Sequence, residues 1–192
     1  AELMGTTQAD TTQLTIPAQV NGLPVTKIGA SAFKGSKLET VVIPDSVTEI
    51  DYNAFSSSYS LRQVTLSKNL SSIGNSAFAY TDLQQIVLPE GLVSIGYQSF
   101  CGSELAEITI PASVRLIGTG SFAHCGNLKS ILVASDNPNY SSKDGVLFSA
   151  DGTTLMAYPE AKGSEYTLPQ GVTALADESF RGNETITHVE FN

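Results

Sequence analysis

Hydrophobic residues recur along the chain with a period of 22 or 23 residues. The most visible column is aromatic: the first four gaps between its members are 22, 23, 22 and 22 residues, and the last is 58. The column consists of Phe33, Phe55, Phe78, Phe100, Phe122 and Phe180. A fixed period of this length indicates a repeat protein. The last gap indicates one further repeat together with an insertion.

Other columns share the phase of the phenylalanines. Each Phe follows an aliphatic residue by five positions and another by eight, and a small residue directly precedes it. Around Phe78 these residues are Ile73, Leu70 and Ala77, and Leu83 follows five positions later. One such unit cannot bury its own apolar side, whereas stacked units align every column into a continuous core. The pattern therefore predicts a solenoid of stacked coils.

Each repeat contains a segment with strand patterning. Residues 38–43 end in alternation between apolar and polar positions, which is typical of a β-strand. Residues 47–50 are shorter and half apolar, so we expect a second, weaker strand. The stretch that includes the Phe, such as residues 77–80, is interpreted as one tight helical turn. The predicted fold class is a repeat solenoid, mostly β with parallel strands and short helical turns in each coil.

Two segments depart from the period. After Leu14, the Asn21-Gly22 pair inserts a turn that we expect to cap one end of the stack. A larger break covers residues 134–167, where two apolar runs flank Asp151-Gly152 and predict a β-hairpin. The expected organisation is a single domain over residues 1–192, with a tail at 1–13, regular repeats at 14–133, the hairpin insertion at 134–167 and a last repeat at 168–192.

The repeat pattern Ile-Pro-x-x-Val-x-x-Ile-Gly-x-x-Ala-Phe-x-x-x-x-Leu-x-x-Val-x-Ile resembles the BspA-like leucine-rich repeats. Residues 43–66 and 88–110 carry it most fully, and the resemblance covers residues 14–192. The chain departs from the family at the cysteine usual a few residues after the Phe. Only Cys125 keeps it, and the other repeats have Ser36, Tyr59, Thr81, Ser103 and Asn183. A metal or disulfide requirement at this position is therefore not expected.

Charge and composition narrow the classes of partner. The formal net charge is −9, which repels phosphate backbones and anionic membrane surfaces, so we expect no nucleic-acid partner. The longest apolar runs are far shorter than a membrane span, so we expect no membrane insertion by this segment. Residues 1–4 have neither the basic start nor the apolar stretch of a signal peptide. The chain does not begin with Met, which indicates either a processed protein or a recombinant expression product.

Candidate chemistry is sparse. Cys101 and His124 could meet as a thiol–imidazole pair, but no third residue that would orient them is evident. A Cys101–Cys125 disulfide is also possible, although the two residues are out of register by two positions of the repeat. Residues 118–123 superficially resemble a phosphate-binding glycine loop without the surrounding βαβ unit. Asp144, Asp151 and Glu160 could suggest calcium, although Asp-Gly turns explain the first two. We expect no enzyme activity, cofactor or metal.

The outer positions of the main strands form the candidate protein-contact face. Most of these positions carry uncharged polar residues and a few carry apolar ones. Such a surface suits contact with a protein partner, but it is also what an ordinary solvent-exposed sheet shows. The candidate residues are Thr40, Gln63, Gln85, Glu107, Val42, Thr65, Val87, Thr109 and Leu132. A second candidate patch, for which packing within the hairpin region is the alternative explanation, consists of Tyr52, Tyr97, Tyr140, Tyr158 and Tyr166.

The family resemblance implies a function that the residues alone do not. BspA-like proteins are surface or secreted proteins of host-associated bacteria and some protozoa, and members are implicated in adhesion to host matrix proteins. We therefore expect a non-catalytic, secreted or cell-surface bacterial module that binds host or matrix proteins. The alternative is a structural spacer in a longer surface protein, because the chain ends at Phe191-Asn192 within a core strand. Ligand and oligomeric state are left open.

Overall fold

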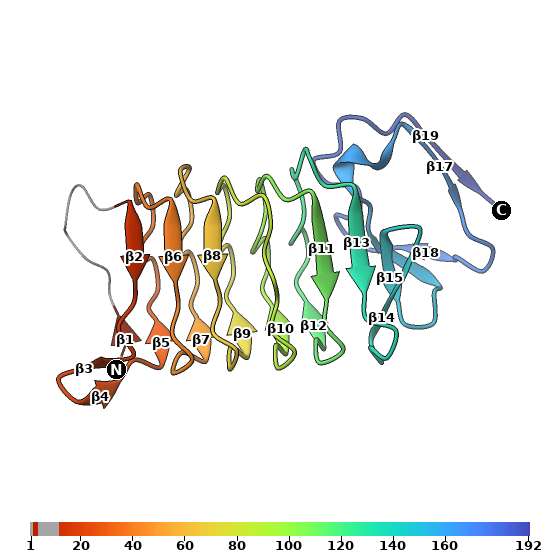
Figure 1. The fold of residues 1–192 in the computed structure, drawn as a ribbon. Coiled ribbons are helices and arrows are strands. Elements are labelled where there is room, and N and C mark those ends of the chain that lie inside the picture. Colours follow the sequence, from red (N-terminus) through yellow and green to blue (C-terminus); the bar gives the residue numbers. More distant parts are fainter. Residues whose placement is uncertain (1, 4–11) are drawn as a thin grey trace.

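The computed structural model describes residues 2–3 and 12–192 and shows an elongated stack of coils (Figure 1). One side of the stack is a parallel sheet of six short strands, one from each successive coil. In order these are β1 (Glu2–Leu3), β5 (Lys27–Ile28), β7 (Glu49–Ile50), β9 (Ser72–Ile73), β10 (Ser94–Ile95) and β12 (Leu116–Ile117). The predicted weaker strand is thereby confirmed. Within the predicted tail, β1 is already a rung of this sheet.

The opposite side carries the longer, main strands. They are β2 (Gln13–Thr15), β6 (Thr40–Val42), β8 (Gln63–Thr65), β11 (Glu107–Ile110) and β13 (Ser130–Val133). The first three pair in parallel, as do the last two. Residues 84–88 occupy the place between β8 and β11 without forming a strand, so the main sheet is interrupted there.

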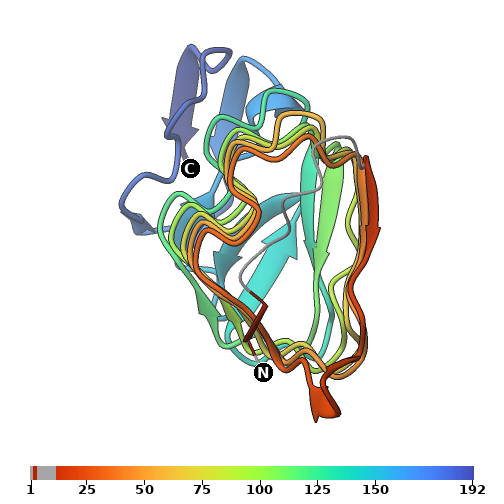
Figure 2. The ribbon, with the colours of Figure 1, turned by 90° about the vertical axis from the view of Figure 1, so that its left-hand side faces the viewer.

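The phenylalanine column forms the centre of the core, as predicted. Seen along the stack, the regular coils superimpose (Figure 2). Successive rings from Phe33 to Phe122 have centroids 5.2, 5.3, 5.6 and 6.1 Å apart, with planes within 9° of parallel. Phe55, Phe78 and Phe100 are fully buried, and the aliphatic columns surround them. Ring stacking adds to the transfer free energy of each buried side chain.

The predicted helical turns are wrong. The segments around the phenylalanines are tight turns in which left-handed residues recur, such as Ser76 with φ of 54° and Tyr80 with φ of 57°. A left-handed residue every few positions interrupts the right-handed path that a helix requires. In the described chain the one helix is the 3-10 turn η1 (Glu160–Lys162).

Four of the six repeats have a glycine at the start of the turn, and at Gly96 and Gly118 close approach of the coils explains it. A Cβ on Gly96 would lie 2.6 Å from the carbonyl carbon of Gly74, and one on Gly118 would lie 2.3 Å from the nitrogen of Tyr97. Neither glycine has positive φ. Absence of a side chain is therefore what the close approach requires at Gly96 and Gly118, whereas Asp51 and Ala176 occupy this position in two other repeats.

The N-terminal irregularity is a protruding hairpin. β3 (Gln19–Val20) and β4 (Leu23–Pro24) are antiparallel, and the predicted Asn21-Gly22 turn joins them with positive φ at both residues. The hairpin projects beside the first coils (Figure 2).

The C-terminal part combines the predicted hairpin with further coils. β14 (Tyr140–Lys143), β15 (Val146–Ser149) and β16 (Thr154–Ala157) form an antiparallel meander. β16 then pairs in parallel with β18 (Ala174–Leu175), and β17 (Glu165–Leu168) pairs in parallel with β19 (His188–Phe191). The chain therefore re-enters the repeat at Thr154, before the predicted position at Leu168.

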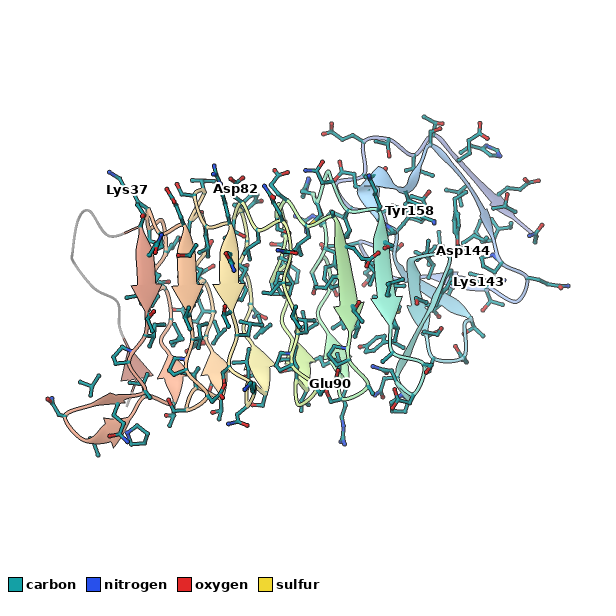
Figure 3. The ribbon with its side chains drawn as sticks, in the orientation of Figure 1. Lys37, Asp82, Glu90, Lys143, Asp144 and Tyr158 are labelled. Atoms are coloured by element: carbon teal, nitrogen blue, oxygen red, sulfur yellow. The ribbon has the colours of Figure 1, made fainter. Side chains whose placement is uncertain are left out.

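Tyr158 takes the phenylalanine position in this extra coil. Its N–H donates to the carbonyl of Ser179 at 2.8 Å, as that of Phe100 donates to Ser121 at 3.0 Å. The Tyr158 ring lies 5.2 Å from Phe180, and Figure 3 shows it within the C-terminal part. Residues 134–167 are thus a meander followed by most of a shortened coil.

The two parts of the stack meet at an imperfect junction. Among the described rings, none stacks on the C-terminal side of Phe122, where a cavity of about 50 Å³ lies between this ring and Tyr158. Residues 137–140 supply hydrogen-bond partners in place of those that a regular next coil would provide. The N–H of Ile117 donates to the hydroxyl of Tyr140 at 2.9 Å. The amide of Asn137 donates to the carbonyl of Pro111 at 2.7 Å.

Candidate functional site

The nine candidate contact residues lie on the outer side of the main strands and of residues 84–88. Eight are exposed and Thr40 is half-buried, whereas their neighbours Val41, Val64, Ile86 and Ile108 point into the core. Strand alternation produces this division. We call this surface the main-strand face. Its role as a contact surface stays a prediction.

The centre of the main-strand face is irregular. Val87 is 85% exposed, the largest value among the exposed large hydrophobic side chains of the described residues. Within the described chain, no backbone hydrogen bond joins residues 85–88 to β8 or β11; the amide of Ala106 still reaches the carbonyl of Gln84 at 3.3 Å. A protruding apolar side chain therefore sits beside unpaired peptide groups.

Two depressions flank Val87. One, of about 460 Å³, lies towards β11 and is lined by Gln85, Glu107 and Thr109. The other, of about 370 Å³, lies towards β8 and is lined by Gln63 and Thr65. The sequence did not predict the two depressions or the protruding Val87, because Ile86 and Leu88 keep the apolar pattern of a strand and both are buried.

Charged side chains lie at the borders of the main-strand face. Lys37 and Asp82 lie at one edge of the main strands and Glu90 at the other (Figure 3). Asp82 accepts from the guanidinium of Arg62 at 3.0 Å, and Glu107 accepts from the hydroxyl of Ser130 at 2.7 Å. A mild centre with a polar rim is the usual anatomy of a protein interface.

The cysteines do not form a site. Cys101 and Cys125 are free and buried, so the disulfide alternative is wrong. The Cys125 thiol contacts the Ser103 hydroxyl at 3.4 Å and the Phe100 carbonyl at 3.2 Å, and burial raises its pKa to about 11. Burial also raises the pKa of Cys101, whose Sγ lies 4.0 Å from the hydroxyl of Tyr80. Such thiols are inert rather than nucleophilic.

The cysteine column is a ladder of small polar groups. In the second repeat its member is Ser58, not Tyr59 as expected, and the Ser58 hydroxyl donates to the carbonyl of Phe33 at 2.8 Å. Cys125 likewise lies against the carbonyl of Phe100 in the preceding coil, whereas the Thr81 hydroxyl donates to the carbonyl of Phe78 in its own turn at 2.9 Å. These side chains satisfy the carbonyls of the turns, which explains why serine, threonine and cysteine are interchangeable there.

Of the three insertion carboxylates, that of Asp151 is occupied by structural contacts, whereas one carboxylate oxygen of Glu160 is buried without a hydrogen-bond partner. Asp151 accepts from the hydroxyl of Ser149 at 2.6 Å and from the N–H of Thr153 at 3.0 Å, and these bonds lower its pKa. Lys162 donates to the backbone carbonyl of Asp144. In the part of the chain that the structure describes, no three His, Cys, Asp or Glu side chains are grouped as metal ligands.

The glycine-rich segment 118–123 is unsuited to phosphate. The carboxylate of Glu178 lies against Gly120, 2.5 Å from the position that a Cβ would take. A negative group at this place opposes an anion. Gly118 serves the close approach of coils described above.

The five candidate tyrosines divide into two groups. Tyr140 and Tyr158 are buried, and Tyr166 is half-buried with its ring 5.0 Å from Tyr158, so these three serve packing. Tyr52 and Tyr97 are exposed on the turns. Sequence reasoning missed two further exposed tyrosines on the turns, Tyr59 and Tyr80, although their places after Phe55 and Phe78 could have indicated them.

A search of the described residues for a helix long and apolar enough to span a membrane finds none.

Comparison with solved structures shows similarity to bacterial leucine-rich repeat proteins. A protein from Eubacterium ventriosum is 28% identical, with a TM-score of 0.85 over 93% of this chain and 47% of that one. The pneumococcal vaccine antigen PcpA is 26% identical, with a TM-score of 0.74 over 100% of this chain and 57% of that one. A leucine-rich cell surface protein from Faecalibacterium prausnitzii is 28% identical, with a TM-score of 0.54 over 94% and 63%.

These relatives are longer than the chain, which spans between about half and just under two thirds of their length. No curated protein matches it. The model of the BspA type leucine-rich repeat region matches residues 10–143 in six copies. The stacked phenylalanines, the parallel strands and this match agree, and the chain belongs to the BspA-type leucine-rich repeat family.

Proposed function

We propose that this chain is a non-catalytic adhesion module, exposed on or secreted from a bacterial cell, which binds a host or matrix protein through its main-strand face. The observation that carries the proposal is Val87, an aliphatic side chain almost fully exposed between two depressions. Isolated apolar side chains are common on surfaces, but one that protrudes between hollows has the shape of an interface anchor.

The comparisons support the location and the class. Two of the similar structures are described as a vaccine antigen and as a cell surface protein. Repeat stacks typically bind through an extended surface built from equivalent positions of successive coils. The main-strand face has this arrangement, with Gln63, Gln85 and Glu107 at one position of consecutive coils and Thr65, Val87 and Thr109 at the next.

The test is binding of the chain to purified host matrix proteins and to host cells, measured by biolayer interferometry. Val87→Asp places a charge at the centre of the face, and we expect it to weaken binding at least about tenfold, or about 1.4 kcal/mol. Val93→Asp is the matched control, because Val93 is 42% exposed next to the short strand β10, away from the face.

Two outcomes contradict the proposal. Uniformly blank binding removes the adhesion function and favours the alternative of a structural spacer. Equal binding by both variants removes the main-strand face as the binding surface.

A further inference from the structure

The turns on the side of the stack between the two sheets carry a row of exposed tyrosines. Their exposed fractions are 52% for Tyr52, 71% for Tyr59, 48% for Tyr80 and 41% for Tyr97. We call these four residues the tyrosine strip. Large aromatic side chains grouped on a surface are typical of a binding site.

The tyrosine strip is continuous across neighbouring coils. The N–H of Ser57 donates to Ala79 at 2.8 Å, and the N–H of Tyr80 donates to Cys101 at 2.7 Å. The amide of Ser76 likewise reaches the carbonyl of Tyr97 at 2.8 Å. The three turns that bear the tyrosines are therefore stacked on one another. Tyr52 and Tyr97 take the same position in turns two coils apart, whereas Tyr59 and Tyr80 follow their phenylalanines, so the four rings form a patch that extends across three coils.

Two of the rings are held in place. A Cβ on Gly102 would lie 2.6 Å from the ring of Tyr80, so the ring lies over this glycine of the next coil. The hydroxyl of Tyr97 accepts from the guanidinium of Arg181 at 3.3 Å. Rings fixed before binding lose less conformational entropy when a ligand arrives.

The surroundings of the strip are almost free of charge. Residues 52–60, 74–81 and 96–103 contain no Asp, Glu, Lys or Arg, in a chain whose formal net charge is −9. The nearest charges along the chain are Asp51, Asp82 and Glu104 at the ends of these segments, and the exposed Lys34 lies in the preceding turn. Arg181, which reaches the strip from a later coil, is paired with Glu178 at 2.6 Å. The remaining side chains are mostly hydroxyls and amides, such as Asn75 and Gln98.

The exposed rings and uncharged polar groups of the strip favour one class of ligand. Anionic polymers need several free cations and cationic segments need several free carboxylates, and the segments that bear the four rings offer neither. An uncharged polysaccharide has C–H faces that bury against rings and hydroxyls that hydrogen-bond to Ser, Asn, Gln and Tyr. An extended chain of sugars can cross the three stacked coils that carry the rings.

We propose that the tyrosine strip is a second binding surface, distinct from the main-strand face, which takes a neutral polysaccharide chain along the axis of the solenoid. The surface requires no metal and no charge pairing. It would allow the protein to engage a glycan and a protein at the same time, because the two surfaces share no residue.

The experiment is native affinity electrophoresis of the full chain in gels that contain soluble polysaccharides. The neutral probes are dextran, yeast mannan, xyloglucan and hydroxyethylcellulose, and the charged probes are heparin and polygalacturonate. The variant is Tyr59→Ser/Tyr80→Ser/Tyr97→Ser. The control is Val87→Ser on the main-strand face, and thermal unfolding of each variant shows that the stack is intact.

The proposal expects at least one neutral probe to retard the chain, equally at low and high salt, because no charge pairing is involved. The apparent dissociation constant should rise at least about tenfold in the triple variant and stay unchanged in Val87→Ser. Three results overturn it: no retardation by any neutral probe, equal retardation of the triple variant, or retardation by charged probes alone that salt abolishes. A loss of protein binding in Val87→Asp leaves this result unaffected, so the two functions fail separately.

Discussion

From Phe33 to Phe122 every ring lies on the next in nearly parallel planes, whereas beyond the junction Tyr158 meets Phe180 at 28° and Tyr166 at 54°. The regular stack buries its column almost completely, but Phe180 and Val189 in the C-terminal part are half-buried. Identical neighbours allow identical contacts, so regularity itself gives dense packing. A meander and a shortened coil pack well enough to continue the fold, with a cavity at the seam.

The largest expected effect separates the two parts by their aromatic residues. Phe78→Ala should lower the free energy of unfolding by about 3–5 kcal/mol, because it leaves a cavity between two stacked rings. Phe180→Ala should cost about 1–2 kcal/mol, since its ring is half-buried. Denaturant unfolding measures both. Equal losses would erase the distinction between the two cores.

A glycine pair tests whether coil-to-coil approach limits the regular stack. Gly96→Ala should destabilise by about 1–3 kcal/mol, because the new Cβ would overlap the backbone of Gly74. The control is Gly126→Ala in a later coil, where a Cβ meets nothing within 4 Å and φ is not positive. We expect it to be neutral or slightly stabilising. The comparison breaks down if both variants unfold at the same denaturant concentration.

The junction can be loosened without touching either core. Tyr140→Phe removes the acceptor of the Ile117 N–H and should cost about 1–3 kcal/mol. Hydrogen exchange should show faster opening of residues 154–191 while the coils around Phe55 keep their protection. Uniform acceleration along the chain would show instead that the two parts unfold as one unit.

Alkaline pH probes the buried thiols, above all that of Cys125 in the last regular coil. Burial keeps the Cys125 thiol protonated in the folded state up to a pKa of about 11, above its ordinary value of 9.0, so its contribution to stability is full below pH 9 and is lost as pH rises towards 11. At pH 10 the loss is about 1.4 kcal/mol. Cys125→Ser, with the residue that Ser58 and Ser103 already supply in this column, should reduce the loss of stability between pH 9 and 11, and the part that remains belongs to groups such as Cys101. An unchanged profile in the variant would assign the slope to other groups.

The regular stack could be predicted because one physical cause, burial of repeating columns, sets every position. Tyr158 escaped the prediction because the extra coil is two residues shorter between its strand and its ring: Tyr158 follows Leu155 by three positions, whereas Phe180 follows Leu175 by five. The 22-residue distance from Tyr158 to Phe180 was the available signal. The interruption at residues 84–88 has no such signal, since it depends on backbone geometry that buried Ile86 does not determine.

The left-handed residues were also beyond prediction. Ser57, Gln98 and His124 adopt positive φ without being glycine or asparagine, because the neighbouring coils hold the turn in place. Of the proposed contact surfaces, alternation predicted which main-strand residues face outward, but it could not show that Val87 protrudes between depressions.

The hydrogen bonds between coils point along the stack, so a pulling force applied at the two ends loads them one rung at a time. Each coil that peels away releases about 22 residues, or roughly 75 Å of extended chain. A tether of this kind yields in steps and dissipates work instead of transmitting a sudden load. Single-molecule extension should therefore give a sawtooth with this spacing, and one all-or-none rupture would contradict it.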